Sequence, residues 1–167
     1  MNIQEWKDIG FDQTTLKHRE LVQEIIKKHK PESILDVGCG NGPDMALSIV
    51  NFPSAKIVGF DRDKTNIEFI HSHVSKDAFV GELELVLPTI DKASFDVVIT
   101  NGVLMYVNPE LFHELRRVAK KAVILSEKDP DRRILDVIKS FNPIITKVSA
   151  ETRETWGDDS YIYEIPL

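Results

Sequence analysis

The sequence predicts a single α/β domain built on a doubly wound, mostly parallel sheet of about seven strands that closes with a C-terminal antiparallel hairpin. Short apolar segments alternate with helical patterns along most of the chain, which is typical of parallel strands joined by helices. The last two strand-like segments, residues 144–148 and 161–165, have no helix between them, so we expect them to pair antiparallel at the sheet edge. The length of 167 residues fits one domain.

The expected elements follow one another in a regular order. An amphipathic pattern predicts a first helix over residues 16–29. Further strands are predicted at residues 33–37, 56–60, 78–80, 95–100 and 122–125, and helices are predicted to begin at Pro43 and after Asp63, Asn108 and Asp129. The buried stripe of the helix that begins at Pro43 is expected to comprise Met45, Ala46, Ile49 and Val50. Residues 81–93 show no clear period, and no element is predicted there.

One strand ends in an acid and then leads into a loop of alternating glycines. Residues 34–43 are ILDVGCGNGP, in which Gly38, Gly40 and Gly42 allow the backbone to turn sharply and to approach a ligand closely. About twenty residues further on, the next strand ends in Asp61, which is the place of a ribose-binding acid. A strand, a glycine loop, a helix, a strand and an acid make half of a nucleotide-binding α/β domain.

The details of the loop distinguish between nucleotides. Its glycines are spaced G-x-G-x-G, and Pro43 stands where the dinucleotide fingerprint G-x-G-x-x-G has its third glycine. Asp36, at the strand end, would repel a pyrophosphate and attract a cation such as the ammonium group of an amino acid. S-adenosylmethionine carries a ribose at one end and an amino-acid cation at the other, so it fits both Asp61 and Asp36. No Gly-Lys-Ser/Thr follows the loop, which excludes a Walker motif.

The chain resembles the class I S-adenosylmethionine-dependent methyltransferases in four motifs between Ile34 and Leu125. Residues 35–42 match the family's first motif, and residues 59–63 resemble the second, whose acid holds the ribose hydroxyls. Residues 79–83 resemble the third, where Glu82 stands in place of the usual Asp that receives the adenine amino group, and residues 95–104 resemble the fourth strand and the loop after it. The family's fold also ends in an antiparallel hairpin.

The resemblance implies a set of donor-binding residues. They are Asp36, Gly38, Cys39, Gly40, Gly42, Asp61, Arg62, Glu82, Leu83 and Asn101. Arg62 would stack on the adenine face. Cys39 has no adjacent histidine and no partner cysteine, so we interpret its side chain as a packing residue and not as a nucleophile. No Cys/His cluster indicates a metal site.

In this fold the methyl acceptor lies above the end of the fourth strand. Asn101, Tyr106 and His113 are therefore predicted to contact the acceptor and to act in catalysis, with Glu127 or the N-terminal segment as the alternative. The sulfonium is intrinsically reactive, so the enzyme mainly has to align the nucleophile, the methyl carbon and the leaving sulfur. A general base would help with a hydroxyl acceptor, and the sequence does not single one out.

Composition narrows the choice of acceptor. The net charge of −6 argues against a broad phosphate-binding face and hence against nucleic acid. No apolar run approaches the roughly 20 residues of a membrane span, and the single cysteine and the absence of a signal peptide favour the cytoplasm. We predict methyl transfer to an O, N or C nucleophile of a small molecule. The alternatives are a protein or RNA methyltransferase and a non-catalytic S-adenosylmethionine-binding subunit.

The N-terminal segment is expected to differ from the rest of the domain. Residues 1–30 are predicted to form an N-terminal helical segment, and residues 31–167 the S-adenosylmethionine-binding domain. Trp6, Ile9 and Phe11 are apolar but show no periodicity, and we predict that residues 1–15 close over the donor as a lid. Acceptor specificity would come from residues 1–20, from a homodimer partner or from another protein.

Overall fold

A computed structural model of the chain describes residues 13–103, 108–128, 132–148 and 160–167. Its seven strands are β1 (Ser33–Val37), β2 (Lys56–Asp61), β3 (Ala78–Val80), β4 (Phe95–Asn101), β5 (Ala119–Lys128), β6 (Ile144–Lys147) and β7 (Ser160–Pro166). Its helices are α2 (Gln13–Lys28), α3 (Pro43–Asn51), α4 (Lys64–His73), α5 (Leu83–Val86), the 3-10 turn η1 (Leu87–Thr89), α6 (Leu111–Val118) and α7 (Arg132–Ser140).

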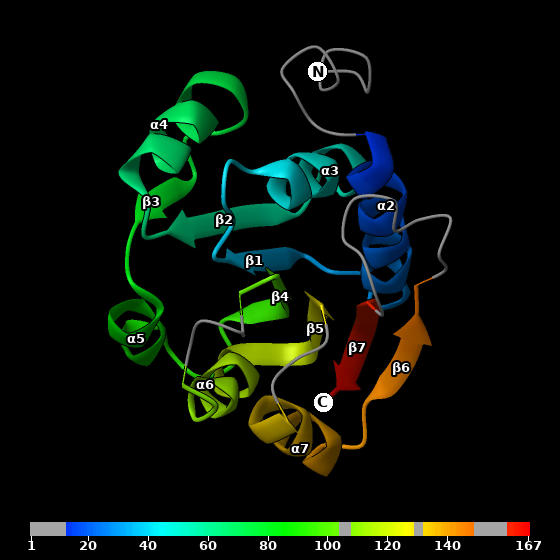
Figure 1. Cartoon of the computed structure of the whole chain (residues 1–167). Helices are drawn as coiled ribbons and strands as arrows, with labels where there is room; N and C mark the ends of the chain where they lie inside the picture. The colour runs from blue at the N-terminus through cyan, green and yellow to red at the C-terminus, as the bar shows by residue number, and fades with distance from the viewer. Residues whose placement is uncertain (1–12, 104–107, 129–131, 149–159) are drawn as a thin grey trace.

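The strands form one sheet in the order β3-β2-β1-β4-β5-β7-β6 (Figure 1). The first five strands of the chain pair in parallel, while β7 lies antiparallel between β5 and β6. The predicted doubly wound sheet and its closing hairpin are therefore confirmed. Because β1 to β5 are parallel, their carboxyl ends all lie on the same edge of the sheet.

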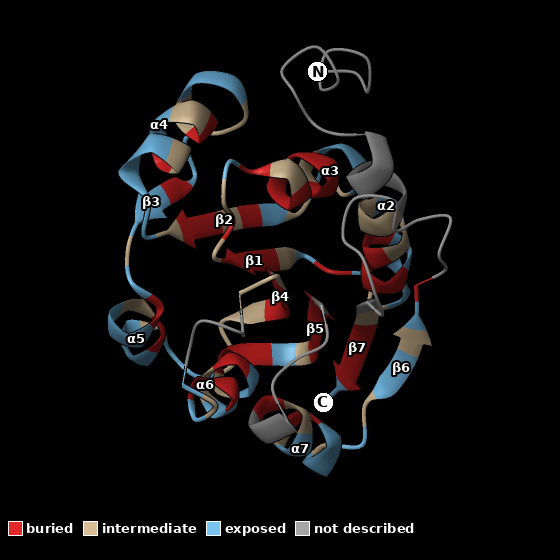
Figure 2. Cartoon of the chain, in the orientation of Figure 1, coloured by how far each residue is buried: buried red, intermediate tan, exposed pale blue. Residues whose placement is uncertain are grey.

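Each face of the sheet has its own hydrophobic core. Leu35 and Val37 of β1 pack with side chains of α6 and α7, whereas Ile34 packs with those of α2, α3 and α4. In Figure 2 the central strands β1, β4, β5 and β7 and the inner sides of the helices are mostly buried, whereas the edge strand β6 is mostly exposed. Successive side chains of a strand point to opposite faces, so Asp36 lies on the same face as Ile34, beneath α2 and α3.

The buried side of α3 differs from the one predicted. Met45 and Ala46 are buried as expected, but Val50 is 51% exposed, and the polar residues Asp44 and Ser48 are buried instead. The physical reason is that α2 lies across α3 and supplies partners for both polar side chains. The predicted apolar stripe assumes that α3 packs only against the sheet. It does not take into account that α2 also packs against α3.

Other boundaries agree closely with the sequence. The bounds of β1 and β3 are those predicted, and the side chain of Asp63 caps α4 by accepting a hydrogen bond from the amide of Thr65, as predicted. The ambiguous residues 81–93 contain α5 and η1. Among the described residues, no helix is long and apolar enough to cross a membrane. The proposed lid, residues 1–15, falls almost wholly outside the described residues and stays a prediction.

Candidate functional site

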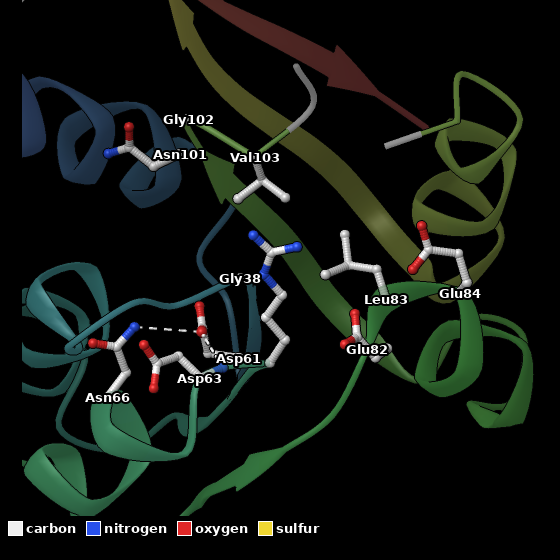
Figure 3. A pocket seen from close by; sticks show the side chains of 11 residues that line it. Gly38, Asp61, Asp63, Asn66, Glu82, Leu83, Glu84, Asn101, Gly102 and Val103 are labelled. Carbon is white, nitrogen blue, oxygen red and sulfur yellow. Dashed lines mark hydrogen bonds between the residues drawn. The ribbon is translucent and has the colours of Figure 1, made fainter. Parts of the chain in front are cut away.

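A cavity of about 320 Å³ opens at the carboxyl ends of β1, β2 and β4 (Figure 3). It is lined by Gly38, Asp61, Arg62, Asp63, Asn66, Glu82, Leu83, Glu84, Asn101, Gly102 and Val103. Six of the residues predicted to bind the donor therefore meet here, although they come from four separate strand ends. Ligands of open α/β sheets bind outside the carboxyl ends of the strands, and this cavity lies at that edge.

The carboxylate of Asp61 is held in one orientation at the end of β2. Its Oδ2 accepts a hydrogen bond from the Gly40 amide at 2.9 Å, and its Oδ1 accepts from the Asp63 amide at 2.8 Å and from Asn66 Nδ2 at 3.3 Å (Figure 3). A carboxylate oxygen can accept about two hydrogen bonds, so Oδ2 keeps capacity for a hydroxyl. The glycine loop thus orients the acid that is predicted to bind ribose.

The glycine loop approaches the segment after β4 very closely. Gly38 has φ +69°, and a Cβ atom placed on it would lie 2.6 Å from a methyl carbon of Val103. Gly42, with φ +90°, caps the amino end of α3 and precedes Pro43 at the first helical position. A side chain is therefore disfavoured at both positions by backbone conformation and by contact, with Val103 at Gly38 and with Ile70, 2.8 Å from a Cβ atom, at Gly42.

The side chain of Cys39 faces the core and not the cavity. Its sulfur lies close to the α-carbon side of Gly59, and the residue is 5% exposed. Burial raises the pKa of the thiol, and the nearby carboxylates of Asp36 and Asp61 raise it further. A thiol of this kind is not a nucleophile at neutral pH. Any contact between Cys39 and a ligand would therefore use its backbone.

The residues that follow β3 form another part of the cavity wall. Leu83 is buried, whereas Glu82 is exposed, precedes α5 and does not use its side chain to cap that helix. The Gly81 amide donates to the carbonyl oxygen of Asp61 at 2.9 Å, which keeps the ends of β2 and β3 together. Glu82 and Leu83 consequently line the same cavity as Asp61 (Figure 3), and their adenine-binding role stays a prediction.

A polar cluster adjoins the cavity on the α2 and α3 side of the sheet. Arg19 of α2 forms an ion pair with Asp44 of α3, and Asn101 Nδ2 donates to the same oxygen of Asp44 at 3.1 Å. His18 Nε2 contacts Ser126 Oγ at the end of β5. Asn101 also lines the cavity, so it joins the two groups of residues.

Asp36 is the most deeply placed acid of this cluster. Burial raises its pKa well above the ordinary value of 3.8, the charge of Asp44 raises it further, and Arg19 and the Met45 amide oppose the shift. Within the described residues, neither Asp36 Oδ2 nor Asp44 Oδ1 has a hydrogen-bond partner. Buried carboxylate oxygens without partners are uncommon and costly. Both atoms are therefore free to accept a hydrogen bond, and the binding of a cationic ligand group by Asp36 stays a prediction.

His18 reaches the end of β5, beside the strand end above which the acceptor was expected. Ser126 pairs with Asn101 in the sheet register, so the imidazole lies over the carboxyl ends of β4 and β5. Burial lowers the pKa of His18 below its ordinary value of 6.5, an effect that Asp44 opposes and Arg19 reinforces. The imidazole is therefore neutral at neutral pH, and a neutral imidazole can accept a proton.

The sequence did not predict four residues of this cluster, namely His18, Arg19, Asp44 and Ser126. A local signal existed for the first two, because His18 and Arg19 precede the buried Val22 by four and three residues and so share its face of α2. The sequence offers no comparable signal for Asp44 and Ser126. Their partners lie 25 and 108 residues away along the chain.

Glu127 holds the segment after β4. Its Oε1 accepts hydrogen bonds from Thr100 Oγ1 at 3.3 Å and from the Val103 amide at 3.2 Å, and the carboxylate is buried. The Gly102 amide donates to the carbonyl oxygen of Ser126 at 2.9 Å. The end of β5 thus positions Gly102 and Val103, both of which line the cavity.

The structure does not bring together all three predicted catalytic residues. Asn101 lines the cavity, whereas Tyr106 lies outside the described residues. His113 packs edge-on against Phe141, with ring centroids 5.5 Å apart, and lines a different cavity near the beginning of β5. Its place on α6 points the imidazole away from the donor cavity, so we do not carry His113 into the proposed catalytic set.

Comparisons with known proteins bear on the class of site. A family model described as a methyltransferase domain matches residues 28–164. A trans-aconitate 2-methyltransferase of Acidovorax sp. (strain JS42) is 23% identical over 133 residues, which are 76% of this chain and 50% of that protein. A malonyl-[acyl-carrier protein] O-methyltransferase of Halalkalibacterium halodurans is 30% identical over 110 residues, which are 60% of this chain and 40% of that protein. The chain thus spans half or less of the length of these two relatives.

Solved structures share the fold at low sequence identity. The plantazolicin methyltransferase BpumL in complex with SAH aligns with a TM-score of 0.72 and 13% identity, covering 92% of this chain and 85% of that one. A SAM dependent methyltransferase from Archaeoglobus fulgidus aligns with a TM-score of 0.68 and 13% identity, covering 99% of this chain and 100% of that one. The fold expected from the sequence motifs is thereby confirmed.

Proposed function

The chain belongs to the methyltransferase-domain family, and on that premise we propose that it transfers a methyl group from S-adenosylmethionine to an O, N or C nucleophile of a small molecule. The observation that carries the proposal is the placement of two aspartates beside the glycine loop, one facing the cavity and one buried. Asp61 presents an oriented carboxylate to the cavity, and Asp36 lies buried beyond Gly38. Few ligands other than an amino-acid-bearing nucleoside need both.

The donor-binding roles follow from position. Asp61 accepts hydrogen bonds from the ribose hydroxyls, and Glu82, Leu83 and Arg62 surround the adenine. Gly38 lines the cavity, and the tight turn of the loop through Gly40 and Gly42 shapes the floor between the two ends of the ligand. Asp61 and Glu82 already face the cavity, so the donor can bind without breaking their hydrogen bonds to the rest of the chain.

Catalysis depends mainly on alignment. When bound, S-adenosylmethionine supplies an electrophilic methyl carbon, so the chain must orient the acceptor and exclude water. Asn101 and His18 stand at the carboxyl ends of β4 and β5, where the acceptor enters. The neutral imidazole of His18 accepts the proton that an O–H or N–H acceptor releases.

A small acceptor is favoured over nucleic acid by charge. Asp61, Asp63, Glu82 and Glu84 line the cavity against one cation, Arg62, among the described lining residues, and the chain carries a net charge of −6. A polyanion would meet repulsion at this edge. The names of the two relatives, a trans-aconitate 2-methyltransferase and a malonyl-[acyl-carrier protein] O-methyltransferase, support an acid as the acceptor. A homodimer partner or another protein would supply further acceptor contacts. We place this activity in the cytoplasm, where a single buried thiol stays reduced.

The proposal is tested by a screen of hydroxyl, amine and carboxylate acceptors for release of S-adenosylhomocysteine. Turnover with one class of acceptor, lost in Asp61→Asn, is the expected result. The proposal fails if S-adenosylmethionine and S-adenosylhomocysteine do not bind in calorimetry, or if they bind and Asp61→Asn leaves their affinity unchanged. NAD provides the negative control, because Pro43 and Asp36 are unsuited to a pyrophosphate.

A further inference from the structure

A second cavity, of about 640 Å³, lies at the amino ends of β4 and β5, on the opposite edge of the sheet from the donor cavity. None of its described lining side chains is acidic, although acidic residues outnumber lysine and arginine by 27 to 21 in the chain. We call this cavity the basic groove, after its basic lining residues Lys92, His113, Arg116, Arg117 and Lys120.

Arg117 builds the wall of the basic groove. Its guanidinium pairs with Glu114 at 2.8 Å and donates to the carbonyl oxygens of Leu87 and Ile90, at 2.8 Å each. These bonds hold α6 against η1 and the residue that follows it. Because its charge is balanced and its donors are bonded, Arg117 shapes the groove and is not available to a ligand.

The other cations of the groove have little opposite charge beside them. Lys120 Nζ lies 3.8 Å from Asp96 Oδ1, but that carboxylate is closer to Lys121, at 2.9 Å. Lys92 and Arg116 form no ion pair or hydrogen bond with the described residues. Like charges that gather without acids repel one another, so an anion is bound more favourably here than elsewhere on this acidic chain.

The side chain of Arg116 is oriented before any ligand arrives. Its guanidinium carbon lies 4.8 Å from the ring centroid of Phe141, which follows α7, and a cation over the face of an aromatic ring is attracted to it. His113 packs edge-on against the same ring. The stacked guanidinium keeps its N–H edge for a carboxylate, which it can bind through two parallel hydrogen bonds.

The remaining lining residues favour a protein segment over nucleic acid. They are Ala93, Ala119 and Leu167, and Leu167 is 46% exposed. Single-stranded nucleic acid binds by stacking its bases on aromatic rings, but Arg116 already covers one face of Phe141. A long polyanion would also extend over a chain of net charge −6. Even an α-carboxylate on Leu167 would balance only one of the positive charges.

We propose that the basic groove is the docking site for an acidic segment of a partner protein. Carboxylates of that segment meet Lys92, Arg116 and Lys120, and an apolar side chain packs on Leu167. Since β4 is seven residues long, the groove lies about 20 Å from the donor cavity along the sheet. A partner seated there leaves the donor cavity open, so the proposal goes beyond methyl transfer and does not depend on it.

The probe for the test is a short fluorescein-labelled peptide that repeats Glu-Glu-Leu, and fluorescence anisotropy measures its affinity for the full chain. The peptide should bind at low salt and more weakly as salt is added, because salt screens exposed charges. A peptide with glutamine in place of glutamate should not bind. Arg116→Glu and Lys92→Glu should each weaken binding of the acidic peptide by about tenfold or more. Arg116→Lys, which keeps the charge and loses the planar group, should weaken it less.

Lys56→Glu is the matched control, because Lys56 is exposed at the start of β2 and the change in net charge is the same. It should change the affinity of the peptide by less than about twofold. Equal losses in Lys56→Glu and Arg116→Glu, or no binding of the peptide to the natural protein, would overturn the proposal. An oligouridylate that binds more tightly than the peptide, and is lost in Arg116→Glu, would assign the groove to nucleic acid instead.

Binding of S-adenosylhomocysteine provides the second readout. Its affinity in Arg116→Glu should stay within about twofold of normal, since the groove lies at the other edge of the sheet. If Arg116→Glu loses this ligand as well, the variant is damaged and Lys92→Glu decides the outcome, because Lys92 lies in an exposed turn before β4. Unchanged binding of the peptide in Lys92→Glu would then reject the docking site.

Discussion

Asn101 Nδ2 donates to Asp44 Oδ2 at 3.1 Å, and this bond joins the carboxyl end of β4 to the first turn of α3. Because Asn101 also lines the cavity, the bond connects the side predicted for the acceptor with the buried acids beside the glycine loop. Asn101→Ala should cost about 1–2 kcal/mol of unfolding free energy, since it removes a donor from a buried carboxylate. Asn101→Asp should cost more, because it places a like charge against Asp44. Urea unfolding of both variants checks this, and equal losses would mean that charge on Asp44 plays no part.

Asp61 should matter for affinity and Asp63 for stability, although they are neighbours on the same cavity. Asp61→Ala is expected to lose about 1.5–3 kcal/mol of binding free energy for S-adenosylhomocysteine, or roughly 10- to 150-fold. Asp63→Ala removes the cap that the Thr65 amide uses, at about 0.5–2 kcal/mol of stability, and should bind the ligand nearly normally. Calorimetry and thermal unfolding separate the two effects. Unchanged affinity in Asp61→Ala would remove it from the site.

The buried carboxylate of Asp36 should lower the free energy of unfolding, a cost that its role in the site would explain. Its pKa is raised in the folded state, mainly by burial, so between pH 3.8 and that raised pKa the folded protein binds more protons than the unfolded chain. Stability contributed by this group therefore falls as pH rises through the raised pKa. Asp36→Asn should be more stable than the natural protein at pH 8 by about 1 kcal/mol or more, with the difference shrinking at lower pH. Chemical denaturation at several pH values measures this, and a variant less stable at pH 8 would contradict it.

Local signals in the sequence predicted the frame of the site but only part of its chemistry. Apolar runs, the glycine loop and the acid of Asp61 are properties of short segments, and each lies where it was expected. The buried Asp44 and the exposed Val50 were not predictable in this way, because their burial depends on how α2 crosses α3. His113 was placed near the acceptor from its distance along the chain after β4, but the direction of a side chain on α6 depends on packing against α7 and Phe141.

Gly38 and Gly40 should respond differently to the same substitution. Both have positive φ, so alanine at either costs about 1–2 kcal/mol of backbone strain. Only Gly38→Ala also forces a Cβ against Val103, whereas nothing lies within 4 Å of a Cβ at Gly40. Gly38→Ala should therefore be less stable than Gly40→Ala by a further 1–3 kcal/mol, roughly the cost of overpacking. Adding Val103→Ala should restore most of that difference, and a double mutant no more stable than Gly38→Ala would assign the cost elsewhere.

His18 should set the pH dependence of methyl transfer to an O–H or N–H acceptor. The imidazole must be neutral to take the proton, and burial lowers its pKa below 6.5, opposed by Asp44 and reinforced by Arg19. The ratio kcat/KM should therefore rise with pH through a value below 6.5 and stay level above it, until another group titrates. In His18→Gln the rising limb should disappear and turnover should fall by about 10²- to 10⁴-fold, with the affinity for S-adenosylhomocysteine within about twofold of normal.

Ser126→Ala, which removes the hydroxyl beside Nε2, should keep the limb but shift its midpoint. An identical pH profile in the natural protein and His18→Gln would show that His18 does not take the proton. The same result is expected for a carboxylate acceptor, which has no proton to lose.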